Sequence, residues 1–122
     1  MPIEFDDGQS PFDFNHRYHG PFYTADHQAW RASLRAFVDK EIMPNVDDWD
    51  EAGEFPRDLY KKAAEVGLLG AGYPEEYGGI PVSDPFFLLV TAEELARTSS
   101  GGVSASLMVH SIGLPPVLAV GC

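Results

Sequence analysis

The stretch from residue 53 to 79, GEFPRDLYKKAAEVGLLGAGYPEEYGG, constrains the fold most because it joins a helix to a glycine-rich loop. Pro56 suits the first helical turn, where its missing N–H is tolerated. Apolar residues then recur at steps of three and four, which places them on one helical face: Leu59, Ala63 and Val66. Gly67 is placed to end the helix in a left-handed conformation, and residues 73–79 have the composition of a loop.

Another amphipathic helix, the first along the chain, is predicted before this stretch. Thr24 or Asp26 can cap its start, and Pro44 ends it. Its apolar residues form one stripe: Trp30, Leu34, Phe37, Val38 and Ile42. Residues 45–54 are acidic, and their spacing does not match an EF-hand calcium loop. We therefore predict that they form a solvated connector.

A third helix is predicted directly after the loop. Ser83 or Asp84 opens it, and Pro85 lies in its first turn. Residues 86–90 are apolar on every side, which predicts that this half of the helix is buried all round. Polar residues return from Thr91 onward, so the second half is predicted to be buried on one side only.

The segment from residue 98 to 122 contains no Asp, Glu, Lys or Arg, and it is long enough to raise the question of a membrane span. Serines, glycines and His110 interrupt it, and no Lys or Arg follows as an anchor. We therefore predict a buried fourth helix from Val103 to about Gly113. The adjacent prolines Pro115 and Pro116 are expected to kink or restart this helix.

Four helices without a convincing strand predict an all-α, four-helix bundle-like fold. We divide the chain into an extended arm at residues 1–21 and a helical domain at residues 22–122. The arm contains aromatic residues that could anchor it to a surface: Phe5, Phe12, Phe14 and Tyr18. His16 and His19 lack partners at metal-ligand spacing, so we interpret them as ordinary surface histidines.

The bulk composition narrows the function class and the compartment. The net charge of −11 argues against binding to nucleic acid or to anionic membranes. The single cysteine, Cys122, excludes an internal disulfide. The first residues have neither the apolar core of a secretory signal nor the arginines of a transit peptide. We therefore expect a bacterial cytoplasmic location, or the mitochondrial matrix if the source is eukaryotic.

Catalytic motifs do not emerge from the sequence. It contains no dinucleotide-binding fingerprint, no P-loop and no metalloprotease motif. Ser106 and His110 lie four residues apart and could touch, but no nucleophile elbow surrounds the serine. We assign no catalytic residue and no metal site.

The ordered set P-x-x-L-Y-K-K-A-A-E-V-G-L-L-G from Pro56, followed by P-E-E-Y-G-G from Pro74, resembles the N-terminal helical domain of the acyl-CoA dehydrogenases. The resemblance covers about residues 22–121. It implies an FAD-dependent enzyme of fatty acid β-oxidation, in which a glutamate takes the α-proton of an acyl-CoA thioester and the flavin accepts the β-hydride. It also implies an electron-transfer flavoprotein-like acceptor and a homo-oligomer, a dimer or tetramer.

In that family the catalytic glutamate and most of the FAD site lie in a middle β domain and a C-terminal helical domain. This chain ends before both, so we expect a fragment, a truncated product or a split protein that is inactive alone. The resemblance further implies that four residues of the fourth helix line the acyl chain: Ser104, Ala105, Met108 and Ile112. They fall on one helical stripe, although such a stripe is also typical of a core.

Two other functions stay open from the sequence. The chain could be a free-standing helical module that binds a lipid chain or a protein partner, or a membrane-anchored acidic protein.

Overall fold

The computed structural model describes residues 23–82 and 84–121, and over these residues it is all-α, as predicted. The helices that make up the domain are α1 (Ala25–Phe37), α2 (Val46–Ala52), α3 (Asp58–Glu65), α4 (Phe86–Ala96), α5 (Gly101–Met108) and α6 (His110–Val120). A π-helical turn, Val38–Ile42, extends α1, and a 3-10 turn, Glu75–Tyr77, lies in the loop before α4. The predicted arm at residues 1–21 lies outside the described residues.

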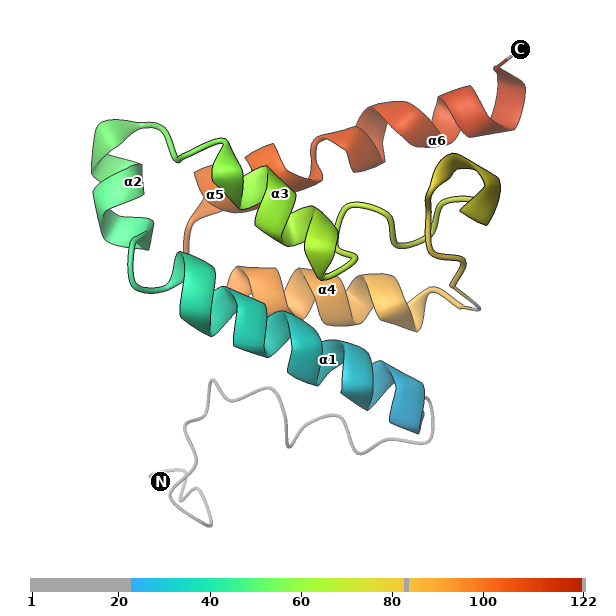
Figure 1. The fold of residues 1–122 in the computed structure, drawn as a ribbon, viewed down its shortest axis with the longest axis horizontal. Helices are drawn as coiled ribbons and strands as arrows, with labels where there is room; N and C mark the ends of the chain where they lie inside the picture. The colour runs from blue at the N-terminus through green and yellow to red at the C-terminus, as the bar shows by residue number, and fades with distance from the viewer. Residues whose placement is uncertain (1–22, 83, 122) are drawn as a thin grey trace, which may run out of the picture.

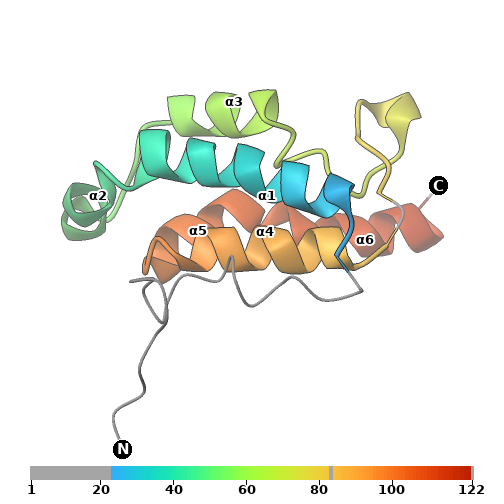
Figure 2. The same ribbon diagram turned by 90° about the horizontal axis from the view of Figure 1, so that it is seen from below.

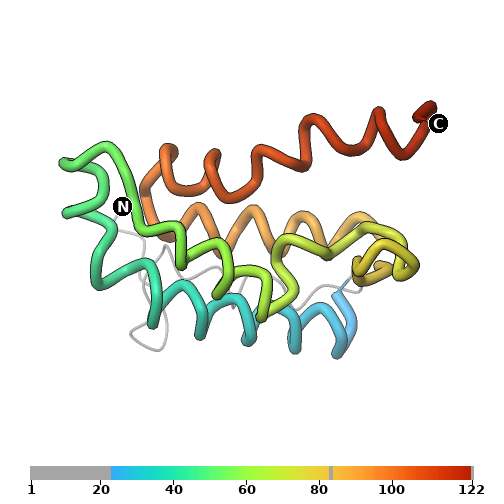
Figure 3. Tube along the Cα trace, turned by 45° about the horizontal axis from the view of Figure 1, so that its top comes forward, coloured from blue at the N-terminus to red at the C-terminus, as the bar shows by residue number. Residues whose placement is uncertain are grey.

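The helices pack as a small bundle in which α1 and α4 run in one direction and α3, α5 and α6 run in the other (Figures 1 and 3). Helices α1 and α4 lie side by side and share the most extensive helix–helix contact of the domain (Figure 2). The glycine-rich loop closes one end of the bundle, beside the end of α6 (Figure 1).

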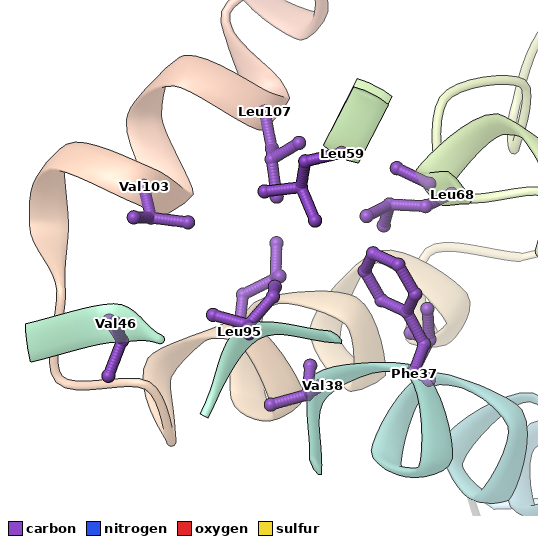
Figure 4. Close-up of a cluster of buried hydrophobic side chains, with 11 residues drawn as sticks. Phe37, Val38, Val46, Leu59, Leu68, Leu95, Val103 and Leu107 are labelled. Atoms are coloured by element: carbon purple, nitrogen blue, oxygen red, sulfur yellow. The ribbon is translucent and has the colours of Figure 1, made fainter. Parts of the chain in front are cut away.

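The hydrophobic core lies where these helices meet (Figure 4). It contains most of the stripe predicted for the first helix, together with residues from every other helix except α6: Leu34, Phe37, Val38, Ile42, Val46, Leu59, Ala63, Leu68, Leu95, Val103 and Leu107. Trp30 and Val66, which were also predicted for the apolar faces, are partly buried against this cluster.

The start of α1 is capped by Thr24, one of the two predicted residues. Its side chain accepts a hydrogen bond from the backbone N–H of His27, and Nδ1 of His27 accepts one from the backbone N–H of Thr24 at 2.8 Å. This is a capping box in which histidine takes the usual place of Glu or Gln. Nε2 of the same buried His27 lies 2.9 Å from Oδ1 of Asp84 and ties α1 to the start of α4.

Helix α3 ends as the sequence predicts. Gly67 is left-handed, with φ +86°. The N–H groups of Gly67 and Leu68 donate to the carbonyls of Ala64 and Ala63, each at 3.0 Å. This pair of bonds is a Schellman motif, which satisfies the last carbonyls of the helix and turns the chain into the glycine-rich loop.

The α1–α4 contact is held by buried ions, which the sequence analysis did not predict. Glu94 is fully buried, and its carboxylate binds Arg31 at 3.2 Å, Arg35 at 3.1 Å and Arg97 at 3.1 Å. Arg31 also binds Glu93, at 2.7 Å. The polar residues of α4 were predicted to lie on the side of the helix that is not buried. They form its contact with α1 instead, because Glu93 and Glu94 bind arginines across the helix pair.

Two other expectations are wrong. The predicted acidic connector contains helix α2, which buries Val46 and ends at the left-handed Gly53. Its first-turn acids, Asp47 and Asp48, favour helix because they face the positive end of the helix dipole. The first half of α4 is not buried all round, since Leu88 is 62% exposed and Leu89 is also exposed.

The C-terminal helix differs most from its prediction. Its interruption falls at Val109, before Pro115 and Pro116, which lie inside α6. A proline ring crowds the carbonyl four residues before it, which for Pro115 and Pro116 means the carbonyls of Ser111 and Ile112, shortly after Val109. The predicted burial holds for α5, which buries Val103 and Leu107, but not for α6, which has no buried residue. Residues 101–120 are long and apolar enough to cross a membrane, judged by length and composition alone. Of the 18-residue apolar segment within them, 11% is buried.

Candidate functional site

A cavity of about 440 Å³ lies between α4, the glycine-rich loop and the junction of α5 and α6. Most of its wall is apolar. Its main apolar and aromatic lining residues are Leu68, Tyr73, Phe87, Met108, Pro115 and Leu118. Cavities of this size and character bind small apolar groups.

Three polar groups on the cavity wall, those of Thr91, Asp84 and Ser111, already have partners within the protein. The Thr91 hydroxyl accepts a hydrogen bond from Nε1 of Trp30 at 3.0 Å and donates to the Phe87 carbonyl at 2.9 Å. Oδ1 of Asp84 accepts the N–H of Phe86 at 2.8 Å, and the Ser111 hydroxyl donates to the Met108 carbonyl at 2.5 Å. These groups fix the shape of the wall, and the cavity can bind an apolar chain without leaving them unpaired.

A second feature of the site is an exposed apolar surface along α6. Its large side chains are Ile112, Leu114, Val117, Leu118 and Val120. Leu118 belongs both to this surface and to the cavity wall. Contiguous apolar surface of this kind marks an interface or a ligand-binding groove.

Comparison with known protein families identifies the family of this chain. Residues 24–122 match the acyl-CoA dehydrogenase N-terminal domain. The chain belongs to the acyl-CoA dehydrogenase family. The matched region includes every described helix and the whole cavity wall.

Individual acyl-CoA dehydrogenases agree with this assignment. The chain is similar to the mitochondrial long-chain specific acyl-CoA dehydrogenase of Rattus norvegicus, with 37% identity over 97 residues, 80% of this chain and 22% of that protein. It is 36% identical over 98 residues to the probable acyl-CoA dehydrogenase YngJ of Bacillus subtilis (strain 168), covering 80% of this chain and 26% of that protein. The chain thus spans about a quarter of the length of these relatives.

The fold agrees as well. The crystal structure of a putative acyl-CoA dehydrogenase from Mycobacterium smegmatis superposes with a TM-score of 0.73 at 44% identity, over 82% of this chain and 26% of that one. Sequence and fold therefore assign the same domain to this acyl-CoA dehydrogenase chain.

The four residues that the resemblance placed along the acyl chain are not equivalent in the structure. Met108 is half-buried, packs against the core cluster and lines the cavity. Ser104 is half-buried, and its hydroxyl donates to the Leu95 carbonyl at 3.4 Å. Ala105 and Ile112 are exposed. Their role as acyl-chain contacts stays a prediction.

Sequence reasoning missed the other side of the cavity. Tyr73 comes from the glycine-rich loop, and Phe87 and Thr91 come from α4. No spacing rule joins these positions to Met108, because the loop and two helices bring them together only in the fold. Within the described part of the chain, no group of three or more His, Cys, Asp or Glu residues could hold a metal ion.

Proposed function

We propose that this chain is the N-terminal part of an FAD-dependent acyl-CoA dehydrogenase and supplies one wall of its acyl-chain site. The observation that carries the proposal is α6, an apolar helix without a buried residue, in a chain that spans a quarter of its relatives. In the proposed enzyme the remaining domains cover this helix, and the acyl chain lies against the cavity wall.

The role of these residues is binding and exclusion of water. Phe87, Met108 and Leu118 surround an alkyl chain with apolar surface, which removes about 25 cal/mol of unfavourable hydration per Å² buried. A chain held in this way fixes the position of the thioester at its other end, and positioning contributes directly to rate. We propose no residue of this chain as the catalytic base.

The glycine-rich loop does not form a diphosphate site for FAD. The glycine-rich loop is closed on itself: the N–H groups of Gly72, Gly78, Gly79 and Ile80 all donate to loop carbonyls. They are therefore not available to cradle phosphates, as the amides of a phosphate-binding loop are. We propose that FAD is bound by the other domains of the enzyme, and that an electron-transfer flavoprotein-like protein reoxidises it.

The proposal is tested with the intact polypeptide that contains these residues, purified with its flavin. Saturated acyl-CoAs are expected to bleach the flavin absorbance anaerobically and to support reduction of a dye acceptor. The 122-residue chain, given free FAD, is expected to show no turnover above the free-flavin blank. An intact flavoprotein that no saturated acyl-CoA reduces would contradict the proposal. Catalysis by the isolated chain would contradict the assignment of the base and FAD to other domains.

A further inference from the structure

The 440 Å³ cavity has a larger neighbour. A cavity of about 820 Å³ lies between the glycine-rich loop and the last turns of α6. Among the described residues, two line both cavities: Tyr73 from the loop and Leu118 from α6. These two side chains therefore stand between the smaller cavity and the larger one, and we call them the partition.

The loop holds Tyr73 in place through its backbone. The N–H of Gly72 donates to the Ile80 carbonyl at 2.9 Å, and the N–H of Ile80 donates to the Gly70 carbonyl at 2.8 Å. Gly79 packs so closely on Tyr73 that a Cβ there would collide with the Tyr73 carbonyl. The backbone that carries the Tyr73 side chain is therefore held in one position.

From this backbone the Tyr73 ring reaches α6. It lies 5.8 Å from the His110 ring, centroid to centroid, at an interplanar angle of 42°. Leu118 stands two helical turns further along α6, and the residue is 45% exposed. One side of the partition is thus anchored by the loop and by an aromatic contact, whereas the other side is a flexible alkyl group.

We propose that the partition ends the acyl-chain site, so that Tyr73 and Leu118 set the longest acyl chain that the smaller cavity accepts. This inference rests on the proposed function and adds a substrate limit to it. Chains that end before the partition gain apolar contact with each methylene. Longer chains must displace Tyr73 or Leu118 to reach the larger cavity. The substrate class is therefore saturated acyl thioesters with a sharp upper length, beyond which the binding gain per methylene is lost.

The chain offers a matched control for each half of the partition. Tyr77 lies in the same loop and Leu114 on the same helix one turn earlier, and both line only the larger cavity. Leu114 is 43% exposed, close to the value for Leu118. Removing the side chains of Tyr77 and Leu114 enlarges the larger cavity and leaves the partition intact.

The test measures how tightly the intact flavoprotein binds alkyl-CoA thioethers with chains of about 4 to 16 carbons. An apolar pocket can distinguish ligands that differ by one methylene, so such a series locates the length limit. These ligands lack the carbonyl that acidifies the α-proton, so binding is separated from turnover. The Tyr73→Ala/Leu118→Ala variant is expected to bind the first chain beyond the wild-type limit about 10-fold more tightly or better, the effect of one well-placed methylene. The Tyr77→Ala/Leu114→Ala variant is expected to keep the wild-type limit.

An unchanged length limit in the folded Tyr73→Ala/Leu118→Ala variant would overturn the proposal that the partition ends the acyl-chain site. Failure of the wild-type protein to bind any of the thioethers would overturn it as well. If that variant does not fold, Leu118→Ala alone decides, because its half-exposed side chain is tolerated on α6; an unchanged limit again overturns the proposal. Flavin bleaching by acyl-CoAs is measured on the same samples. A shifted binding limit without any bleaching would support the partition and contradict the proposed dehydrogenase function.

Discussion

Glu94→Gln is the substitution that most directly tests how the helices are held together. The change keeps the shape of the side chain but removes the charge that three arginines share: Arg31, Arg35 and Arg97. Arg31 is as buried as Glu94, with 2% of its side chain exposed. Removing one partner of a buried ion pair costs about 3–5 kcal/mol, because the remaining charge stays buried without compensation.

This magnitude translates into a large thermal effect. In a domain of this size, 1 kcal/mol corresponds to roughly 4–8 °C in Tm, so Glu94→Gln is expected to lower Tm by at least about 12 °C. Circular dichroism at 222 nm with thermal and urea unfolding gives both Tm and the free energy of unfolding. The carboxylate of Glu93 also binds Arg31 and keeps its charge partly compensated in the variant. The lower end of the expected free-energy cost, about 3 kcal/mol, is therefore the minimum.

Asp58→Asn is the control, since it makes the same chemical change in an exposed pair. Asp58 lies 3.3 Å from Lys62, and its side chain is 61% exposed. Exposed pairs contribute about 0–1 kcal/mol, so this variant is expected to unfold close to the wild-type Tm. If Glu94→Gln cost no more than Asp58→Asn, the buried ion cluster would not hold α1 to α4, and the apolar core alone would account for the packing.

Four further predictions follow from the same structure. Met108→Trp in the intact enzyme is expected to reject long acyl chains while sparing short ones; a Tm lowered by overpacking, about 1–3 kcal/mol, with an unchanged length profile would instead make Met108 a core residue. Gly67→Ala and Gly53→Ala are each expected to cost about 1–2 kcal/mol for their positive φ, because Gly53 has open space around it and a Cβ at Gly67 collides only with the flexible end of the Ile80 side chain; both are read by urea unfolding. Ile112→Lys, at a site 78% exposed, is expected to change the free energy of unfolding of the 122-residue chain by less than about 0.5 kcal/mol and to lower its binding of a hydrophobic dye; undiminished dye binding would place the apolar surface elsewhere. Burial raises the pKa of Tyr23 above 10, so the folded state keeps its proton longer and stability falls as pH rises through 10; Tyr23→Phe is expected to flatten the decline of Tm between pH 10 and 11.

The sequence predicted those parts of the fold that depend on local chemistry. Thr24 and Gly67 were placed correctly as helix ends because a cap needs only a few neighbouring residues. The stripe from Leu34 to Ile42 was correct because the period of a helix is visible in one segment. Helix α2 was missed because seven residues with three apolar positions give too short a pattern to distinguish from an acidic loop.

What the sequence could not show are the contacts between segments. Glu94 meets Arg31 across 63 positions of the chain, and a carboxylate on a helix has the same local pattern whether it faces water or an arginine. The cavity has the same origin: Tyr73, Thr91 and Met108 share a wall only because the loop and two helices converge. The family resemblance, which carries three-dimensional information that periodicity lacks, predicted Met108 as an acyl-chain contact, and that role stays a prediction.

The distribution of polarity in this domain differs in two respects from that of a free-standing helical bundle. Charged side chains are seldom fully buried, and large apolar surfaces are seldom fully exposed. Here Glu94 and Arg31 are buried between α1 and α4, while Leu88 and Leu89 on α4 and the large apolar side chains of α6 are exposed. The ion cluster joins α1 to α4 without using the apolar side of α4, so that side remains available to another surface. This arrangement supports the proposal that the exposed faces of α4 and α6 are built to be covered by the other domains of an acyl-CoA dehydrogenase.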